Sequence, residues 1–313
     1  KKAGKSNNTI KGISSISNIA LLRMEGTGMV GVVGIASRLF GCLSRAGINI
    51  IFLTQGSSEH SICFGIVPNE VKKAQKCVEE EFRFEIQNRQ IAPLVVETSN
   101  SIIAVIGENM SNVPGVSAKM FKALGKNGIN VKAIAQGSSE LNITTIIDNY
   151  NEAKALNALH EIFFENDAHS VNVFLVGPSG LIGKTLLNQI KNQFDYLKKE
   201  KSIEINVTGV INSKKMLIDS NGIDLKKWDT LLDEKGETSS IDTFTNKIID
   251  LNFANSVFVD CSASKHVVEF YEKLLKKSIS IVTPNKIANT LSQEKYVRLR
   301  ELAKKSNARF MYE

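Results

Sequence analysis

The sequence predicts an α/β protein in which two βαββαβ units in tandem precede a doubly wound parallel sheet. A repeat with an offset of 81 residues, from Gln55 to Gln136, predicts the tandem units. A strand, glycine turn, helix and strand in succession predict the parallel sheet in the second half. The composition agrees, because 313 residues with 42% hydrophobic and 23% charged residues can bury the cores of two or three domains.

The repeat is centred on a Gln-Gly-Ser-Ser-Glu segment that begins at Gln55 and again at Gln136. In each copy we expect a strand, a glycine loop, an amphipathic helix, two β-rich runs around the repeated segment and a second helix. Their expected ranges are 19–24, 26–34, 35–43, 48–53, 61–67 and 70–82 in the first copy, and 102–106, 107–115, 116–124, 129–135, 142–147 and 152–164 in the second.

A further strand at 91–97 completes the first copy, whereas the second copy runs directly into a new domain near Val171. The segment Thr9–Ile13 precedes the first copy and has no role in it. We expect this segment to supply the missing strand, which would interlock the two copies. The expected parts of the chain are residues 1–17 (a linker with the orphan strand), 18–99, 100–168 and 169–313.

The repeated glutamines suit a small amino-acid ligand. Glycine loops leave backbone N–H groups near a helix N-terminus free to hold a carboxylate. Gln55 and Gln136 offer a donor and an acceptor at the end of an inner strand, and Asn49 and Asn130 lie on the same strands. The alternative is that the segment is only a hairpin turn, since glycine and serine are turn residues.

This tandem pattern resembles the ACT regulatory domains of aspartate kinases. Gly12–Ile16 and Gly28–Gly31 are similar to the segment that joins such a kinase to its first ACT domain, although Val33 stands where the second copy has Pro114. The resemblance implies ferredoxin-like ACT domains, homo-oligomers formed through them, and threonine or another small amino acid bound by Gln55 and Gln136.

The second half begins with an apolar strand at 171–176, followed by a glycine turn, a helix to about residue 194 and a strand at 203–211. This is the context of a Rossmann dinucleotide site, although the spacing is G-x-x-G-x-x-G. The alternative is that these glycines serve only packing. The cofactor-binding residues expected in the turn are Gly177, Ser179, Gly180, Leu181, Ile182 and Gly183.

The end of the second strand indicates which dinucleotide binds. NAD-selective folds place an acid there for the ribose hydroxyls, whereas NADP requires a cation for its 2′-phosphate. Here the residues are Asn212, Ser213 and Lys214, and the next acid is Asp219. The sequence therefore predicts NADP, with an ordinary exposed loop as the alternative.

Two later segments are similar to homoserine dehydrogenase: Val259-Asp260-Cys261-Ser262, and Thr-Pro-Asn-Lys-Ile-Ala-Asn-Thr at 283–290. Both follow strands of the parallel sheet, where ligands bind. The resemblance implies that Lys286 is catalytic and lies beside the nicotinamide and the substrate. It also implies that Ser262 lines the same pocket and that Cys261 borders the cofactor.

An ACT pair followed by this domain is the order of bifunctional aspartate kinase–homoserine dehydrogenases. Such a parent would phosphorylate aspartate with ATP and Mg²⁺, reduce aspartate semialdehyde to homoserine with NADPH, and respond to threonine. We expect the kinase domain and the dehydrogenase substrate domain to lie outside this sequence, and therefore expect no turnover from the chain alone. The alternative is a stand-alone amino-acid sensor with a non-catalytic dinucleotide domain.

Other classes of function are disfavoured. Cys42, Cys63, Cys77 and Cys261 show no metal-ligand spacing, so free thiols in a reducing cytoplasm are expected. The net charge of +7 comes largely from scattered lysine doublets without interleaved aromatic residues, which predicts solvated faces rather than a nucleic-acid or membrane surface. No apolar run approaches the length of a membrane span.

Overall fold

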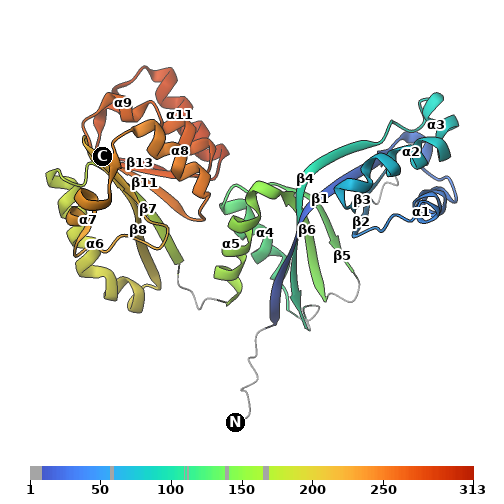
Figure 1. The fold of residues 1–313 in the computed structure, drawn as a ribbon, viewed down its shortest axis with the longest axis horizontal. Helices are drawn as coiled ribbons and strands as arrows, with labels where there is room; N and C mark the ends of the chain where they lie inside the picture. The colour runs from blue at the N-terminus through green and yellow to red at the C-terminus, as the bar shows by residue number, and fades with distance from the viewer. Residues whose placement is uncertain (1–8, 57–59, 109, 111–112, 138–140, 165–168) are drawn as a thin grey trace, which may run out of the picture. The chain divides into compact units, whose positions relative to one another are not determined.

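The computed structural model describes residues 9–56, 60–108, 110, 113–137, 141–164 and 169–313. The chain divides into two compact units, Lys1–Met120 with Ile129–Leu156, and Phe121–Gly128 with Asn157–Glu313 (Figure 1). The last three residues of each repeated Gln-Gly-Ser-Ser-Glu segment lie outside the described residues, as do the first eight residues of the chain.

The first half of the chain forms one six-stranded sheet with the order β2-β3-β1-β4-β6-β5. All the pairings between neighbouring strands are antiparallel. The elements are β1 (Ile10–Glu25), α1 (Ile35–Arg45), β2 (Phe52–Gln55), β3 (Ser61–Ile66), α2 (Val71–Glu81), α3 (Arg83–Gln87), β4 (Val95–Gly107), α4 (Val116–Lys126), β5 (Val131–Gln136), β6 (Asn142–Asp148) and α5 (Glu152–Phe164).

The two copies share their long strands. The first part of β1 pairs with the second part of β4, with Ile13 opposite Val105, so the N-terminal segment completes the second copy as predicted. The end of β1 pairs with the start of β4, which completes the first copy. Between these parts both strands contain one left-handed residue, Asn18 with φ 56° and Ser99 with φ 61°, and these two positions are equivalent in the repeat.

Equivalent positions of the two copies are buried. The pairs related by the repeat offset include Leu22 and Ile103, Leu39 and Met120, and Leu43 and Leu124, and all six side chains are fully buried. The apolar stripe that predicts each first helix therefore faces the core in both copies.

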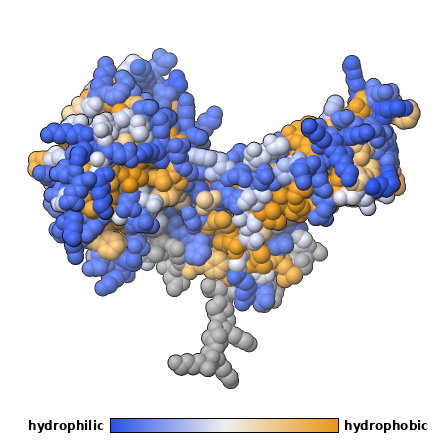
Figure 2. All heavy atoms as spheres, in the orientation of Figure 1, coloured by the Kyte–Doolittle hydropathy of each residue, from blue (hydrophilic) through white to orange (hydrophobic). Residues whose placement is uncertain are grey.

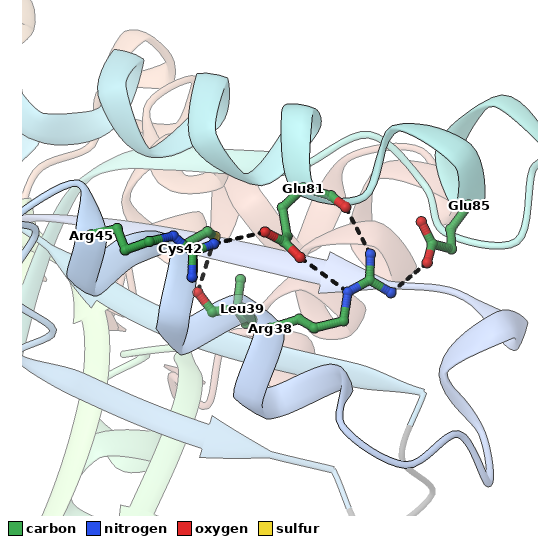
Figure 3. A network of polar contacts seen from close by, with 6 residues as sticks. All are labelled: Arg38, Leu39, Cys42, Arg45, Glu81 and Glu85. Atoms are coloured by element: carbon green, nitrogen blue, oxygen red, sulfur yellow. Dashed lines mark hydrogen bonds and ion pairs between the residues drawn. The ribbon is translucent and has the colours of Figure 1, made fainter.

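An ion-pair network joins the helices of the first copy (Figure 3). Arg38 of α1 donates through Nε to Glu81 Oε1 at 3.1 Å and through Nη1 to Glu85 Oε1 at 2.5 Å. Its Nη2 donates to the Glu81 carbonyl at 2.7 Å, and Arg45 contacts the other Glu81 oxygen at 2.8 Å. Hydrogen bonding to Arg38 outweighs the effect of burial and lowers the pKa of Glu85.

The second half contains a seven-stranded sheet with the order β10-β9-β8-β7-β11-β12-β13. The five strands from β8 to β13 in this order are parallel, as predicted, and β9 and β10 extend the sheet in antiparallel pairing. The elements are β7 (His169–Val176), α6 (Leu181–Glu200), β8 (Ile203–Ile211), β9 (Lys215–Ile218), α7 (Trp228–Lys235), β10 (Glu237–Thr238), α8 (Ile241–Leu251), β11 (Ser256–Asp260), α9 (Lys265–Val268), α10 (Tyr271–Lys276), β12 (Ser280–Thr283), α11 (Gln293–Lys305) and β13 (Phe310–Tyr312).

Helices cover both faces of this sheet. Leu187 and Ile190 of α6 pack on one face with Leu232 of α7, whereas Phe244 of α8 and Leu299 of α11 belong to the cluster on the other face. Between β11 and β12 the chain forms two short helices, α9 and α10, in place of one continuous helix.

Hydrophilic side chains cover much of the visible face of each unit (Figure 2). Of the twelve doublet lysines that the structure describes, eleven are exposed, in line with the prediction of solvated faces, and only Lys215 is partly buried. Among the described residues, no helix combines the length and hydropathy that a membrane crossing requires.

Candidate functional site

The glycine turn after β7 is built by close contacts between its own backbone groups. Gly177 has φ 80°, which permits the sharp turn out of the strand. A Cβ on Gly183 would lie 2.1 Å from the Gly177 carbonyl oxygen, so glycine lets the first turn of α6 approach the strand end. Gly180 precedes α6 without a side-chain cap, so the helix presents its first N–H groups at this turn. This arrangement suits a bound phosphate group.

The turn after β8 is organised by the Asn212 side chain. Asn212 Oδ1 accepts hydrogen bonds from the backbone N–H groups of Lys214 and Lys215, each at 2.8 Å, and this tight turn directs the chain into antiparallel β9. Its Nδ2 donates to Ser179 Oγ at 3.4 Å, which links the two turns. The Lys214 side chain is exposed and has no ion-pair partner among the described residues.

A pocket of about 500 Å³ lies at the carboxyl ends of these strands. This volume is in the usual range for a small-molecule site. Four predicted residues line it, namely Gly177, Asn212, Ser213 and Ser262. The other lining residues are Val176, Ile211, Ser239, Ser240, Ile241, Asp242, Ser264, His266 and Val267.

Several lining residues come from segments that the sequence analysis did not assign to the site. Ser239 donates through Oγ to the Asn212 carbonyl at 2.6 Å, and Ser240 caps α8 by accepting from Thr243 N–H at 3.2 Å. A helix cap before an apolar run was the available indication for Ser240. His266 lies on α9 and contacts Glu269 at 3.0 Å.

The remaining predicted cofactor residues are not among the residues that line the pocket. Leu181 and Ile182 are 85% and 52% exposed on the first turn of α6. Cys261 donates its N–H to the Val176 carbonyl at 3.0 Å. Its side chain packs against the hydrophobic cluster that contains Leu187 and Ile190 of α6, called the α6-side cluster below. Burial, followed by the charge of Asp260, raises the pKa of the Cys261 thiol to about 11, so this thiol stays protonated at neutral pH. Lys286 is exposed at the start of a short 3-10 helix, Lys286–Thr290.

The predicted effector residues occupy equivalent positions in the two copies. Gln55 is the last residue of β2 and Gln136 the last residue of β5, and both side chains are exposed. Asn49 and Asn130 are exposed just before these strands. The structure thus offers two matching sets of exposed polar side chains, each with a glutamine at the end of an edge strand and an asparagine just before that strand.

Two protein-family models match parts of the chain. A model described as "ACT domain" matches residues 22–82 and again 103–163. A model described as "Homoserine dehydrogenase, NAD binding domain" matches residues 179–313. The first match covers both repeat copies, and the second covers the glycine turn from Ser179 onward together with Lys286.

Curated relatives match nearly the whole chain. The chain is 42% identical to "Bifunctional aspartokinase/homoserine dehydrogenase 2, chloroplastic" of Arabidopsis thaliana over 305 residues, which is 97% of this chain and 33% of the relative. It is 39% identical to "Bifunctional aspartokinase/homoserine dehydrogenase" of Haemophilus influenzae over 304 residues, which is 97% of this chain and 37% of the relative. The chain thus spans about a third of the length of these relatives.

Among solved structures, the regulatory subunit of aspartate kinase from Thermus thermophilus is similar to half of this chain. The match has 24% identity and a TM-score of 0.42, and covers 50% of this chain and 98% of the subunit. The family models and the curated relatives agree along the length of the sequence. The chain belongs to the bifunctional aspartokinase/homoserine dehydrogenase family, of which it carries the two ACT domains and the NAD-binding domain.

Proposed function

We propose that the chain is the regulatory and NADP-binding part of a bifunctional aspartokinase/homoserine dehydrogenase. The observation that carries the cofactor assignment is the Asn212 turn, which displays the exposed Lys214 at the end of β8. A charge-assisted bond from this lysine to a 2′-phosphate would favour NADP over NAD by about tenfold to a hundredfold. Asp242 also lines the pocket, but Asn246 and Lys273 contact its carboxylate.

The residues present fit a dinucleotide. The Gly177–Gly183 turn and the start of α6 would hold the pyrophosphate, and the pocket wall with Ser262 would face the rest of the cofactor. NADPH, when bound, supplies the hydride for reduction of an aldehyde. Lys286 lies on the turn after β12, where its ammonium would stabilise negative charge developing on the carbonyl oxygen. Both catalytic reactions are proposed for the whole protein and not for this part alone.

The ACT pair is proposed to bind threonine and to restrain the activities of the whole protein. Gln55 and Gln136 would contact the ligand, with Asn49 and Asn130 beside them. Such regulation needs only a difference in affinity between two states, typically 1–3 kcal/mol. The ACT domains are also the proposed contact between subunits of a homo-oligomer.

The cofactor assignment is tested by titrating NADPH and NADH into the chain and following nicotinamide fluorescence. We expect NADPH to bind at least tenfold more tightly than NADH. Lys214→Ala should remove most of this difference, whereas Lys276→Ala, which changes an exposed lysine of α10, should leave it unchanged. Equal affinity of the unmodified protein for both dinucleotides would contradict the assignment to NADP.

A further inference from the structure

Asp260 is a buried carboxylate at the end of β11. Its side chain is fully buried, and no lysine or arginine among the described residues forms an ion pair with it. A buried carboxylate without a cation is costly unless hydrogen-bond donors surround it. Four donors do so, as Ser262 N–H and Oγ contact Oδ1 at 2.8 and 2.6 Å, and Tyr271 Oη and Asn285 Nδ2 contact Oδ2 at 2.7 and 3.1 Å.

The two carboxylate oxygens hold two different segments. Oδ1 fixes the loop after β11, where Ser262 Oγ also accepts the Ser264 N–H at 3.2 Å. Oδ2 fixes Asn285, the residue directly before Lys286. Asn285 also donates to the Ser264 carbonyl at 3.2 Å, and its Oδ1 accepts the Ile287 N–H at 3.1 Å. Asp260 therefore connects the pocket serine to the turn that carries the proposed catalytic lysine.

Tyr271 closes this arrangement from the core side. Its ring is fully buried on α10, edge-on to Phe258 and Phe310. Burial, followed by the charge of Asp260, raises the pKa of Tyr271 far above its ordinary value, so its hydroxyl remains a hydrogen-bond donor. The carboxylate thus keeps the same donors over the physiological pH range.

We propose that Asp260 is a positioning residue that holds Ser262 and Lys286 together on the nicotinamide side of the site. This inference rests on the proposed function as a dinucleotide-binding domain. Asp260 contacts neither the glycine turn nor the Lys214 turn by any hydrogen bond between described residues. Its removal should therefore disturb the nicotinamide end of the cofactor and leave the end with the 2′-phosphate in place.

The test uses two ligands that differ in their nicotinamide. NADPH engages the whole site, whereas adenosine 2′,5′-bisphosphate carries the 2′-phosphate without a nicotinamide. In Asp260→Asn an amide N–H₂ group replaces one acceptor oxygen and confronts a donor. We expect this variant to bind NADPH at least tenfold more weakly, with loss of the enhanced nicotinamide fluorescence, and to bind the bisphosphate within twofold of the unmodified protein.

Two further variants complete the design. Tyr271→Phe keeps the carboxylate and removes one of its four donors. We therefore expect about a threefold loss of affinity for NADPH and no loss of affinity for the bisphosphate. Asp224→Asn changes an exposed aspartate that accepts the Lys226 N–H, and it should leave both affinities unchanged. If Asp260→Asn does not fold, Tyr271→Phe decides the question, and an unchanged NADPH affinity in it would then overturn the proposal.

The outcomes separate this inference from the proposed function. If the unmodified protein binds neither ligand, the dinucleotide assignment fails and the positioning role fails with it. If it binds both ligands but Asp260→Asn weakens them equally, or weakens neither, only the positioning role is overturned. Selective loss of NADPH binding supports the role of Asp260 at the nicotinamide end.

Discussion

Gly183 lies against the carbonyl oxygen of Gly177, so closely that a Cβ on Gly183 would be 2.1 Å from that oxygen and 2.9 Å from the Pro178 Cα. Both neighbours are backbone atoms, which cannot turn away as a flexible side chain can. Gly183→Ala should therefore lower the free energy of unfolding of this unit by about 1–3 kcal/mol and strongly weaken NADPH binding. Urea unfolding followed by the fluorescence of Trp228, which packs in the α6-side cluster, measures the stability change.

The matched control for this substitution is Gly180→Ala. Gly180 has φ −75°, and the nearest atom to its Cβ would be the Gly177 oxygen at 3.6 Å. We expect its stability cost to stay below about 1 kcal/mol. Equal stability costs for the two alanine variants would contradict the role assigned to the Gly177–Gly183 contact.

The shared strands predict that the second copy depends on the segment that precedes the first copy. Removing residues 1–16 takes away the part of β1 that pairs with 102–107 of β4, and this leaves backbone groups of β4 without partners. Amides in 102–107 should then exchange with solvent at least tenfold faster, as measured by hydrogen exchange and mass spectrometry. Removing residues 1–8 spares β1 and is the control. Unchanged protection of β4 after the longer deletion would show that the pairing adds no stability.

The Arg38 network predicts a pH-dependent contribution to stability. Because folding lowers the pKa of Glu85 below its ordinary value of 4.5, its stabilisation is complete above that value and is lost as the pH falls through the lower folded pKa. Arg38→Met should lower the free energy of unfolding by about 1 kcal/mol at pH 7, and the difference should shrink as the pH falls from 6 to 3. Urea unfolding, monitored by far-UV circular dichroism at each pH, measures this difference in the free energy of unfolding.

The control for Arg38 is the exposed pair Lys76 and Glu80, whose charged atoms are 3.9 Å apart within α2. Lys76→Met should change the free energy of unfolding by less than about 0.5 kcal/mol. If the effect of Arg38→Met is constant from pH 6 to 3, the packing of Arg38 on the Phe82 ring, and not its ion pairs, stabilises the helices.

The effector proposal predicts that threonine binding depends on both glutamines. Gln55→Ala and Gln136→Ala should each lower the affinity for threonine by about threefold to tenfold, because each variant loses a hydrogen-bonding amide. Isothermal calorimetry on the chain measures the affinity, and Gln87→Ala, which changes an exposed glutamine of α3, is the control. Heat with lysine or methionine but not with threonine would assign a different effector.

The sequence predicted the repeat and its interlocking strand, but not the continuity of the long strands. Asn18 and Ser99 interrupt the alternation of side chains with left-handed residues, so each long strand resembles two short ones in sequence. The strand predicted from Ile91 begins at Val95, because the preceding residues connect α3 to the sheet. Pairing across the repeat decides the strand limits, and local pattern does not contain that information.

At the candidate site, local motifs predicted the residues within each single turn. The residues that reach the pocket from other elements depend on the order of the strands and could not be predicted in this way. The glycine turn and the Asn212 turn each lie within a few residues of a strand, so their pattern is visible in the sequence. Ser240 and His266 reach the same pocket from α8 and α9, which only the strand order brings there. The link from Ser262 to Asn285 through Asp260 likewise needs the parallel pairing of β11 with β12.

The sharing of β1 and β4 also determines where the regulatory region can be divided. A cut between Asn18 and Ile19 separates the two parts of β1, and a cut between Ser99 and Asn100 does the same for β4. Any fragment that starts or ends at one of these two cuts carries one copy with a strand missing from its sheet. The ACT pair is therefore the smallest unit that protein engineering can transplant, permute or express as a sensor module, even though the sequence repeats with half that period.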